Sequence, residues 1–425
     1  MKETAVPASM FESASKPAAA RSTLLLALSS VAVLALSACG LSGTDGNKDD
    51  TAAAPAAGAT IAAAPAANDP DYTKLESTDI ADVQARPDMQ VQVVLDQLGF
   101  GPGVIDGKMG LSTHNGLMGF QEANGLQASG KLDETTKSAL AQWANVVATK
   151  VVRIPDSWAT VEYLKTPDGP EAQSKLKQLG YQSLDEKLAE RFHTTVEVLK
   201  QLNPGGQPAG SPAPVAGKVP VSATATPTPT PSPAPSASAS GVALPAVFSA
   251  GQLVRVPNVG MGFDAASSGD NPDWSRTLAS LGVAPNQPKV ARLTVDKSES
   301  VLRAYDASDK LVALFTVTSG SSHDPLPLGD WKINVVSKNP PFNYNPDLFW
   351  DAKAGDEKAK LPPGPNGPVG VVWIDLNKEH YGIHGTPEPQ NIGRTQSHGC
   401  VRLTNWDVAR LAQMVSTSTK VLFQA

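Results

Sequence analysis

Alternating apolar and polar residues in the last third of the chain predict β-structure. Residues 290–295, 300–305 and 311–318 each alternate over the length of a strand. The pairs Asp296–Lys297 and Ser308–Asp309 supply turn-forming residues between them. An early meander of three strands is therefore expected.

Further elements are predicted downstream of this meander. Residues 331–335 and 371–376 have strand patterns, and residues 404–415 have a helical pattern that Thr404 or Asn405 caps. The Pro-rich, aromatic residues 339–350 are predicted to be a loop, either near an active site or packed on the surface. We predict a β-rich domain over residues 288–425, a mixed sandwich or barrel with a helix.

Helical periodicity appears earlier, over residues 86–146. Apolar residues recur at helical spacing from Val91 to Leu98 and again through Leu117 and Phe120, with a glycine-rich turn region between. Asp133 marks the start of a third helix. A small three-helix domain is predicted.

Residues 178–257 combine two helical faces with a closing strand that ends at Pro257. A Pro-rich insertion over residues 205–247 interrupts this segment and is expected to be stiff and extended. Residues 39–85 begin with an Ala- and Gly-rich stretch and are predicted to be a disordered tether. With 36 prolines and 35 glycines among 425 residues, the chain fits several modest domains joined by linkers.

The charge and the N-terminus restrict partners and compartment. The net charge of −6 argues against nucleic acid, which requires a basic surface. Residues 24–36 form an apolar run too short to span a bilayer, after Lys16 and Arg21, as in a secretory signal. We predict a signal peptide over residues 1–38; translation starting at Met10 is an alternative.

Cys400 is the candidate nucleophile. The chain has two cysteines, and Cys400 follows His398 and Gly399 and lies downstream of His384. A thiol with imidazole bases has the groups that thiolate catalysis needs. In an extended backbone, His398 and Cys400 would project to the same side. We therefore predict His398 as the base; a buried structural cysteine is the alternative.

The segments His384-Gly385-Thr386 and Ser397-His398-Gly399-Cys400-Val401-Arg402 resemble the active-site motif of the L,D-transpeptidases. The resemblance implies that Cys400 attacks the diaminopimelate carbonyl of a tetrapeptide stem of peptidoglycan, releases D-alanine and passes the acyl group to an amine. It implies no metal and no cofactor. The acceptor is open: a stem amine that gives 3→3 cross-links, a lipoprotein lysine, or water.

Site roles follow from the chemistry and from this resemblance. His384 is a candidate hydrogen-bond donor or proton shuttle. The resemblance implies that Ser397 is the third member of the catalytic group with Cys400 and His398, acting through its main chain. The N–H groups of Cys400 and Gly399 are candidate oxyanion donors. Arg402 suits a substrate carboxylate, with Arg394 and Gly385 as weaker substrate-binding candidates; a structural ion pair is the alternative for Arg402.

Other segments resemble cell-wall modules. Residues 105–110 (Ile-Asp-Gly-Lys-Met-Gly), with Phe120-Gln121 and Leu132-Asp133, resemble the three-helix peptidoglycan-binding domain, with Gly116 where that family usually has alanine. Residues 178–257 resemble a lysin motif, which binds glycan strands. Residues 36–40 resemble a bacterial lipobox in which Cys39 is the lipidated residue. This resemblance implies a lipid anchor. Gly40 after the lipidated position favours sorting to the outer membrane, which would place the protein in the periplasm of a Gram-negative bacterium.

Other readings remain open at this level. The signal could be an ordinary secretory one, and the three-helix module could be a spacer. A zinc hydrolase using His384, His398 and Cys400 is disfavoured by their spacing. A non-catalytic wall-anchored binding protein is a further alternative. We expect the N-terminal modules to localise the enzyme from across a stiff linker, leaving the chemistry to residues 288–425.

Overall fold

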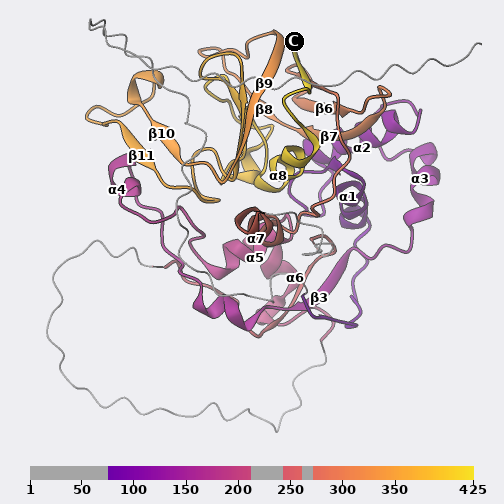
Figure 1. Cartoon of the computed structure of the whole chain (residues 1–425). Helices are drawn as coiled ribbons and strands as arrows, with labels where there is room; N and C mark the ends of the chain where they lie inside the picture. The colour runs from indigo at the N-terminus through magenta and orange to yellow at the C-terminus, as the bar shows by residue number, and fades with distance from the viewer. Residues whose placement is uncertain (1–74, 212–242, 261–270) are drawn as a thin grey trace, which may run out of the picture. The chain divides into compact units, whose positions relative to one another are not determined.

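The computed structural model describes residues 75–211, 243–260 and 271–425 (Figure 1). The predicted signal peptide, Cys39 and most of the Pro-rich insertion lie outside these residues. No helix in the described ranges is long and apolar enough to cross a membrane.

A ten-stranded sheet forms the C-terminal region, in the order β2-β7-β6-β5-β15-β9-β12-β13-β14-β8. Parallel pairing joins β15 to β5 and β13 to β14. A separate hairpin pairs β10 (Phe342–Tyr344) with β11 (Ala359–Leu361), so the predicted loop over residues 339–350 contains one short strand. The strands of the large sheet are β2 (Phe100–Gly101), β5 (Arg292–Asp296), β6 (Val301–Tyr305), β7 (Leu311–Thr316), β8 (Thr318–Ser319), β9 (Gly329–Lys338), β12 (Val372–Leu376), β13 (Gly382–His384), β14 (Val401–Arg402) and β15 (Lys420–Gln424).

The sheet curls back on itself. β7 is the second strand of the order and β8 the last, yet only Val317 separates them along the chain. Consecutive Cα atoms are about 3.8 Å apart, so the two ends of the sheet must approach each other. The β-rich prediction is confirmed, with the strands rolled into a curled sheet.

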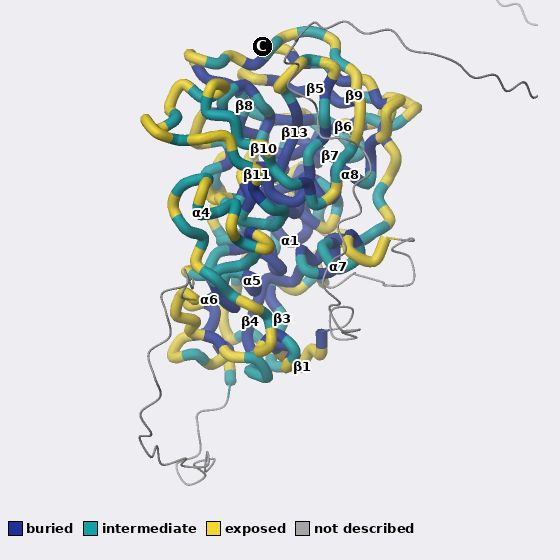
Figure 2. The backbone as a smooth tube through the Cα atoms, turned by 60° about the vertical axis from the view of Figure 1, so that its left-hand side comes forward, coloured by how far each residue is buried: buried dark blue, intermediate teal, exposed yellow. Residues whose placement is uncertain are grey.

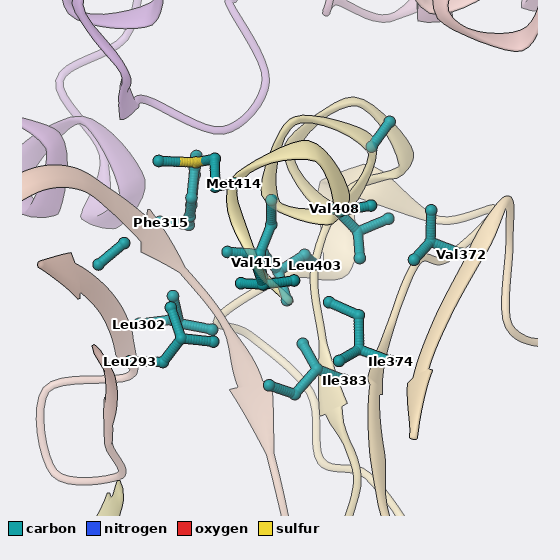
Figure 3. Close-up of a cluster of buried hydrophobic side chains, with 14 of the residues drawn as sticks. Leu293, Leu302, Phe315, Val372, Ile374, Ile383, Leu403, Val408, Met414 and Val415 are labelled. Atoms are coloured by element: carbon teal, nitrogen blue, oxygen red, sulfur yellow. The ribbon is translucent and has the colours of Figure 1, made fainter. Parts of the chain in front are cut away.

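One helix fills the inside of this curl. α8 (Asn405–Met414) begins at Thr404, whose hydroxyl accepts a hydrogen bond from the Asp407 N–H at 3.1 Å. Its apolar face packs on the sheet in a buried cluster (Figure 3). The labelled members of the cluster are Leu293, Leu302, Phe315, Val372, Ile374, Ile383, Leu403, Val408, Met414 and Val415. α7 (Pro272–Leu281) contributes Trp274 and Leu278 to the same cluster, so this core begins before the predicted boundary at residue 288.

Three helices occupy the region predicted as a small helical domain: α1 (Pro87–Leu98), α2 (Leu111–Ala123) and α3 (Glu134–Leu140). Asp133 caps α3 by accepting the Thr136 N–H at 2.8 Å. β2 lies between α1 and α2 and pairs with β7 of the large sheet. Glycine at position 119 permits close packing, since a Cβ there would lie 2.7 Å from the Leu314 Cβ.

The middle segment has its own sheet, in the order β1-β3-β4. Its strands are β1 (Ser77–Thr78), β3 (Thr149–Arg153) and β4 (Leu253–Pro257), and its helices are α4 (Pro170–Ser174), α5 (Leu184–Arg191) and α6 (Val196–Leu202). Short 3-10 turns lie at Ala141–Trp143, Asp156–Thr160, Pro204–Gly206, Pro346–Leu348 and Pro389–Asn391. β3, which pairs with β4, lies before residue 178, where the sequence placed the start of the lysin-motif-like segment.

Residues 75–85 are ordered, which corrects the predicted tether over residues 39–85. Leu75 packs in a buried cluster with Trp158 and Phe192, and β1 pairs with β3. Asp82 accepts hydrogen bonds from Arg86 at 2.7 Å and from Thr149 at 2.8 Å. This end of the predicted tether is therefore structured, because its few apolar residues find partners that are distant in sequence; residues 39–74 lie outside the described residues.

A buried polar network joins the helical module of α1 to α3, the middle segment and α8. Asp96 on α1 contacts the His193 Nδ1 at 3.0 Å and the Arg410 guanidinium at 3.3 Å. His193 also stacks on Trp406 with ring centroids 5.0 Å apart. Burial raises the pKa of Asp96, but the charges of His193 and Arg410 outweigh it and hold the pKa at about 2.

A second contact in the same region links α5 to α8. Asn405 donates to the buried Glu190 carboxyl at 2.8 Å, and burial raises the pKa of Glu190 to about 7. Figure 2 shows α5, β3 and β4 with many buried residues in dark blue. These contacts show that the expectation of modules lying apart from the C-terminal region is wrong. Removing one partner of a buried ion pair typically costs about 3–5 kcal/mol, so the Asp96–Arg410 contact ties the parts together firmly.

Candidate active site

Cys400 lies at the entry of β14, next to β13 in a parallel pair. The register aligns Ile383 with Val401 and His384 with Arg402. Paired residues of neighbouring strands project to one side of the sheet, so His384 and Arg402 share a face. The Gly382 backbone N–H bonds the Cys400 thiol, and the thiol lies 3.7 Å from the His380 carbonyl oxygen. These contacts place the thiol on the β13 side of the turn.

The Cys400 thiol is protonated at neutral pH in this environment. Burial raises its pKa to about 11, although the Gly382 N–H and the charge of Arg402 both lower it. Cys400 is the free cysteine of the described residues. Attack on a carbonyl therefore requires a base that takes the proton as the bond forms.

His384 is a buried, neutral imidazole on the same face. Burial, and then the charge of Arg402, lowers its pKa to about 3, against the opposing effect of a bond to the Gly385 carbonyl. That bond joins the His384 Nδ1 to the Gly385 oxygen at 2.7 Å, so Nδ1 carries the proton and Nε2 is left as the basic nitrogen. Trp373 stacks on the ring with centroids 5.5 Å apart.

His398 has a different environment. Its Nε2 lies 2.9 Å from the Asp351 carboxylate, and its Nδ1 is buried without a hydrogen-bond partner among the described residues. Phe349 meets the ring edge-on at 5.2 Å, and Trp350 lies 5.7 Å from it. Residues 339–350 therefore do reach the candidate site, as one of the two sequence interpretations expected.

The backbone around Gly399 corrects one premise. Residues 398–400 form a bend in which Gly399 has φ +94°, so the predicted extended backbone is wrong and His398 and Cys400 do not share a strand face. A Cβ on Gly399 would lie 2.4 Å from the Tyr381 ring. Among the hydrogen bonds of the described residues, none joins the Cys400 thiol to the ring of His384 or of His398.

Ser397 holds the nucleophile turn in place. Its hydroxyl donates to the Cys400 carbonyl at 2.6 Å and accepts the Gly320 N–H at 2.7 Å. Its own N–H bonds the Gly320 carbonyl at 3.3 Å. The structure thus connects Ser397 to the main chain of Cys400 through the side chain, where the sequence suggested a main-chain role toward an imidazole.

The three substrate-binding candidates occupy different places. Arg402 lies beside Cys400 and His384, and its Nε is buried without a partner among the described atoms. Gly385 is packed against Asn405 and contacts His384 through its carbonyl, which suits orientation of the imidazole. Arg394 lies apart, with its guanidinium 3.9 Å from the Cβ position of Gly110 in the helical module.

Sequence analysis missed several groups at this site. Asp351 contacts His398 from 47 residues away, and Trp373 and Tyr381 pack on His384 and Gly399. No local pattern connects these positions, because strand pairing joins Trp373 to His384 and loop packing brings the other residues together. Among the described residues, no group of three His, Cys, Asp or Glu side chains is arranged to hold a metal ion.

Comparison with known proteins identifies two regions of the chain. Residues 291–422 match the L,D-transpeptidase catalytic domain, and residues 88–140 match a peptidoglycan binding domain. The chain is 32% identical to the L,D-transpeptidase YkuD of Bacillus licheniformis over 31% of this chain and 63% of that protein. It is 30% identical to an L,D-transpeptidase of Fuscovulum blasticum over 30% of this chain and 67% of that protein.

A third relative is YbiS of Escherichia coli, described as an L,D-transpeptidase, with 30% identity over 31% of this chain and 44% of that protein. Among solved structures, the catalytic domain from the E. faecium L,D-transpeptidase is similar at 19% identity and a TM-score of 0.25, over 33% of this chain and 100% of that chain. The curled β-rich domain with its thiol turn is therefore a catalytic domain of the L,D-transpeptidase type. The chain belongs to the L,D-transpeptidase family.

Proposed function

We propose that this chain is a peptidoglycan L,D-transpeptidase in which Cys400 is the nucleophile and His384 its base. The observation that carries the proposal is the shared face of β13 and β14. His384 and Arg402 lie on that face, and Cys400 directly precedes β14, so that the charge of Arg402 acts on both the imidazole and the thiol. Neither group needs to be ionised at rest, because the proton moves when the substrate is attacked.

The first half-reaction forms a thioester. The Cys400 sulfur attacks the diaminopimelate carbonyl of a tetrapeptide stem while the His384 Nε2 accepts the thiol proton. The Gly385 carbonyl, bonded to Nδ1, stabilises the imidazolium that results. The C–N bond to D-alanine then breaks, and His384 returns the proton to the leaving amine.

Backbone donors and Arg402 support this step. The N–H groups of Cys400 and Gly399 are the proposed oxyanion donors, held by the Ser397 contact to the Cys400 carbonyl. The unpartnered Nε of Arg402 is available for a substrate carboxylate. His398 contacts Asp351, Phe349 and Trp350 and is assigned no proton transfer in this step.

The acceptor we propose is the side-chain amine of a neighbouring stem, which yields a 3→3 cross-link and restores the thiol. The match of residues 88–140 to a peptidoglycan binding domain supports this choice, since a wall-bound enzyme meets neighbouring stems at high local concentration. The lysin-motif-like segment would add contacts to glycan strands.

The sequence features outside the described residues support an exported enzyme. The apolar run before Cys39 suits a lipoprotein signal, and a lipid on Cys39 would hold the enzyme at the outer membrane facing the periplasm. Metabolic labelling with a palmitate analogue would test this, because Cys39→Ala should abolish the label.

The decisive test of the reaction has two stages. Incubating the protein with a tetrapeptide or a carbapenem should give a mass adduct on wild type and none on Cys400→Ala; an adduct that persists in the variant contradicts the nucleophile. Muropeptide mass spectrometry in cells carrying wild type or Cys400→Ala then identifies the acceptor. Unchanged 3→3 dimers with altered wall-linked lipoprotein would replace cross-linking by lipoprotein attachment or its hydrolysis.

A further inference from the structure

A pocket outside the thiol site is lined by all three parts of the chain. Its volume is about 510 Å³. One wall is the first loop of the helical module around Lys108 and Met109, the second is α6 with Glu197, and the third is the catalytic-domain loop that carries Arg394. We call it the three-walled pocket.

Hydrogen bonds fix the first two walls to each other. Between the first two walls, the Ile105 N–H donates to the His193 carbonyl at 2.8 Å and the Thr194 hydroxyl donates to the Ile105 carbonyl at 2.7 Å. Gln92 holds the first loop through the Gly107 N–H at 2.7 Å. The pocket is therefore preformed, as binding sites usually are.

Its chemistry points to a carboxylate-bearing peptide. Arg394 and Lys108 both line the pocket, and neither is in any ion pair found among the described residues. A guanidinium binds a carboxylate through two parallel hydrogen bonds, which makes Arg394 the stronger anchor. Glu197 could meet an ammonium group of the same ligand.

The rest of the lining favours peptide over sugar. Met109 and Leu111 are 41% and 42% exposed, and they give the pocket an apolar surface for a peptide's aliphatic parts. None of the pocket-lining residues is aromatic, so a sugar ring has no flat face on which to stack. A stem peptide carries carboxylates, an amine and aliphatic groups together.

The third wall is continuous with the thiol turn. The segment that carries Arg394 runs on to Cys400, and the Gly393 N–H donates to the Thr318 hydroxyl at 2.8 Å. Thr318 is paired with Arg402 in the sheet. We propose that the three-walled pocket binds a second stem peptide of the wall polymer through Arg394, while the first occupies the thiol site. This inference rests on the proposed function for the identity of the polymer.

Calorimetry on the full-length protein tests it. With Cys400→Ala, which prevents acyl transfer, titration with the soluble tetrapeptide should show two sites. Adding Arg394→Gln should leave one site, whereas adding Arg276→Gln, an exposed arginine on α7 that does not line the pocket, should leave two. Arg394→Lys should retain the second site at about tenfold lower affinity.

Several results would overturn the proposal. A single site in Cys400→Ala, or two undiminished sites after Arg394→Gln, excludes a peptide site at Arg394. Binding of a peptide-free glycan that Arg394→Gln abolishes would assign the pocket to sugar instead. A thermal melt of each variant identifies unfolding, in which case Lys108→Gln takes the place of Arg394→Gln and must weaken the second site.

Turnover gives an independent measurement. In otherwise wild-type enzyme, Arg394→Gln should lower the ratio of kcat/KM for multi-stem wall fragments to kcat/KM for the single tetrapeptide by about tenfold. An unchanged ratio contradicts the proposal. Failure of the proposed function is distinguishable, because it appears as the absence of any Cys400 adduct in wild type.

Discussion

The two histidines near Cys400 have opposite environments. His384 is buried on β13, with Nδ1 bonded to the Gly385 carbonyl and Trp373 stacked on its ring. The His398 side chain is 24% exposed, lies on a bend, and has a carboxylate partner in Asp351. One imidazole is kept neutral by its surroundings, and the other is placed beside a negative charge.

The difference shows that adjacency in sequence is a poor guide to which side chains share a strand face. His398 is two residues from Cys400, but the bend at Gly399 breaks the extended backbone that would put both side chains on one strand face. His384 is sixteen residues upstream, yet parallel pairing places it on the face that carries Arg402. The bond from Nδ1 to the Gly385 carbonyl leaves the His384 Nε2 free to accept a proton, which is why we propose His384 as the base.

The largest expected effect is the difference in the rate of thioester formation between variants that lack one histidine or the other. His384→Ala should slow thioester formation by about a thousandfold, since general-base catalysis contributes about 10²–10⁴. His398→Ala should cost less than about tenfold. Single-turnover mass spectrometry with a tetrapeptide measures both, and the reverse order would restore His398 as the base.

Thiol alkylation should follow the raised pKa of Cys400. Because the pKa is about 11, the thiolate fraction, and with it the rate of iodoacetamide modification, should rise about tenfold per pH unit from pH 7 to pH 10. Arg402→Gln removes a charge that lowers this pKa, so its rate should be lower at every pH in this range. A rate that levels off near pH 7 would indicate a resting thiolate–imidazolium pair instead.

Gly399→Ala should perturb the bend that separates the two histidines. The positive φ and the nearby Tyr381 ring leave no room for a Cβ, so the strain should cost about 1–3 kcal/mol. A urea melt measures the loss, with Gly355→Ala, at a positive φ but in open space, as the control. Equal losses in both variants would show that φ alone matters and that the Tyr381 contact does not.

Asp351→Asn should have the smallest effect. It keeps a hydrogen-bond acceptor for His398 but removes the negative charge, and the pair is partly exposed, so turnover should change by about twofold. Asp347→Asn, whose exposed carboxylate pairs with Lys358, serves as the matched control. A loss as large as that of His384→Ala would make Asp351 essential to catalysis.

Local patterns identified much of the molecule correctly. Alternation predicted β5, β6 and β7, and Thr404 and Asp133 cap the helices that the pattern placed after them. These features depend on neighbours along the chain, which sequence shows directly. The motif around Cys400 likewise identified the family, because it fixes several residue types at once.

Only the tertiary structure decided how these pieces meet. The contact of Asp96 with Arg410 joins residues 314 positions apart, and no local pattern encodes it. The same holds for β13 beside β14, which pairs His384 with Arg402, and for Arg394 at the helical module. The sequence determined which groups are available for chemistry, and strand register and packing determined which of them share a face, because those depend on long-range pairing.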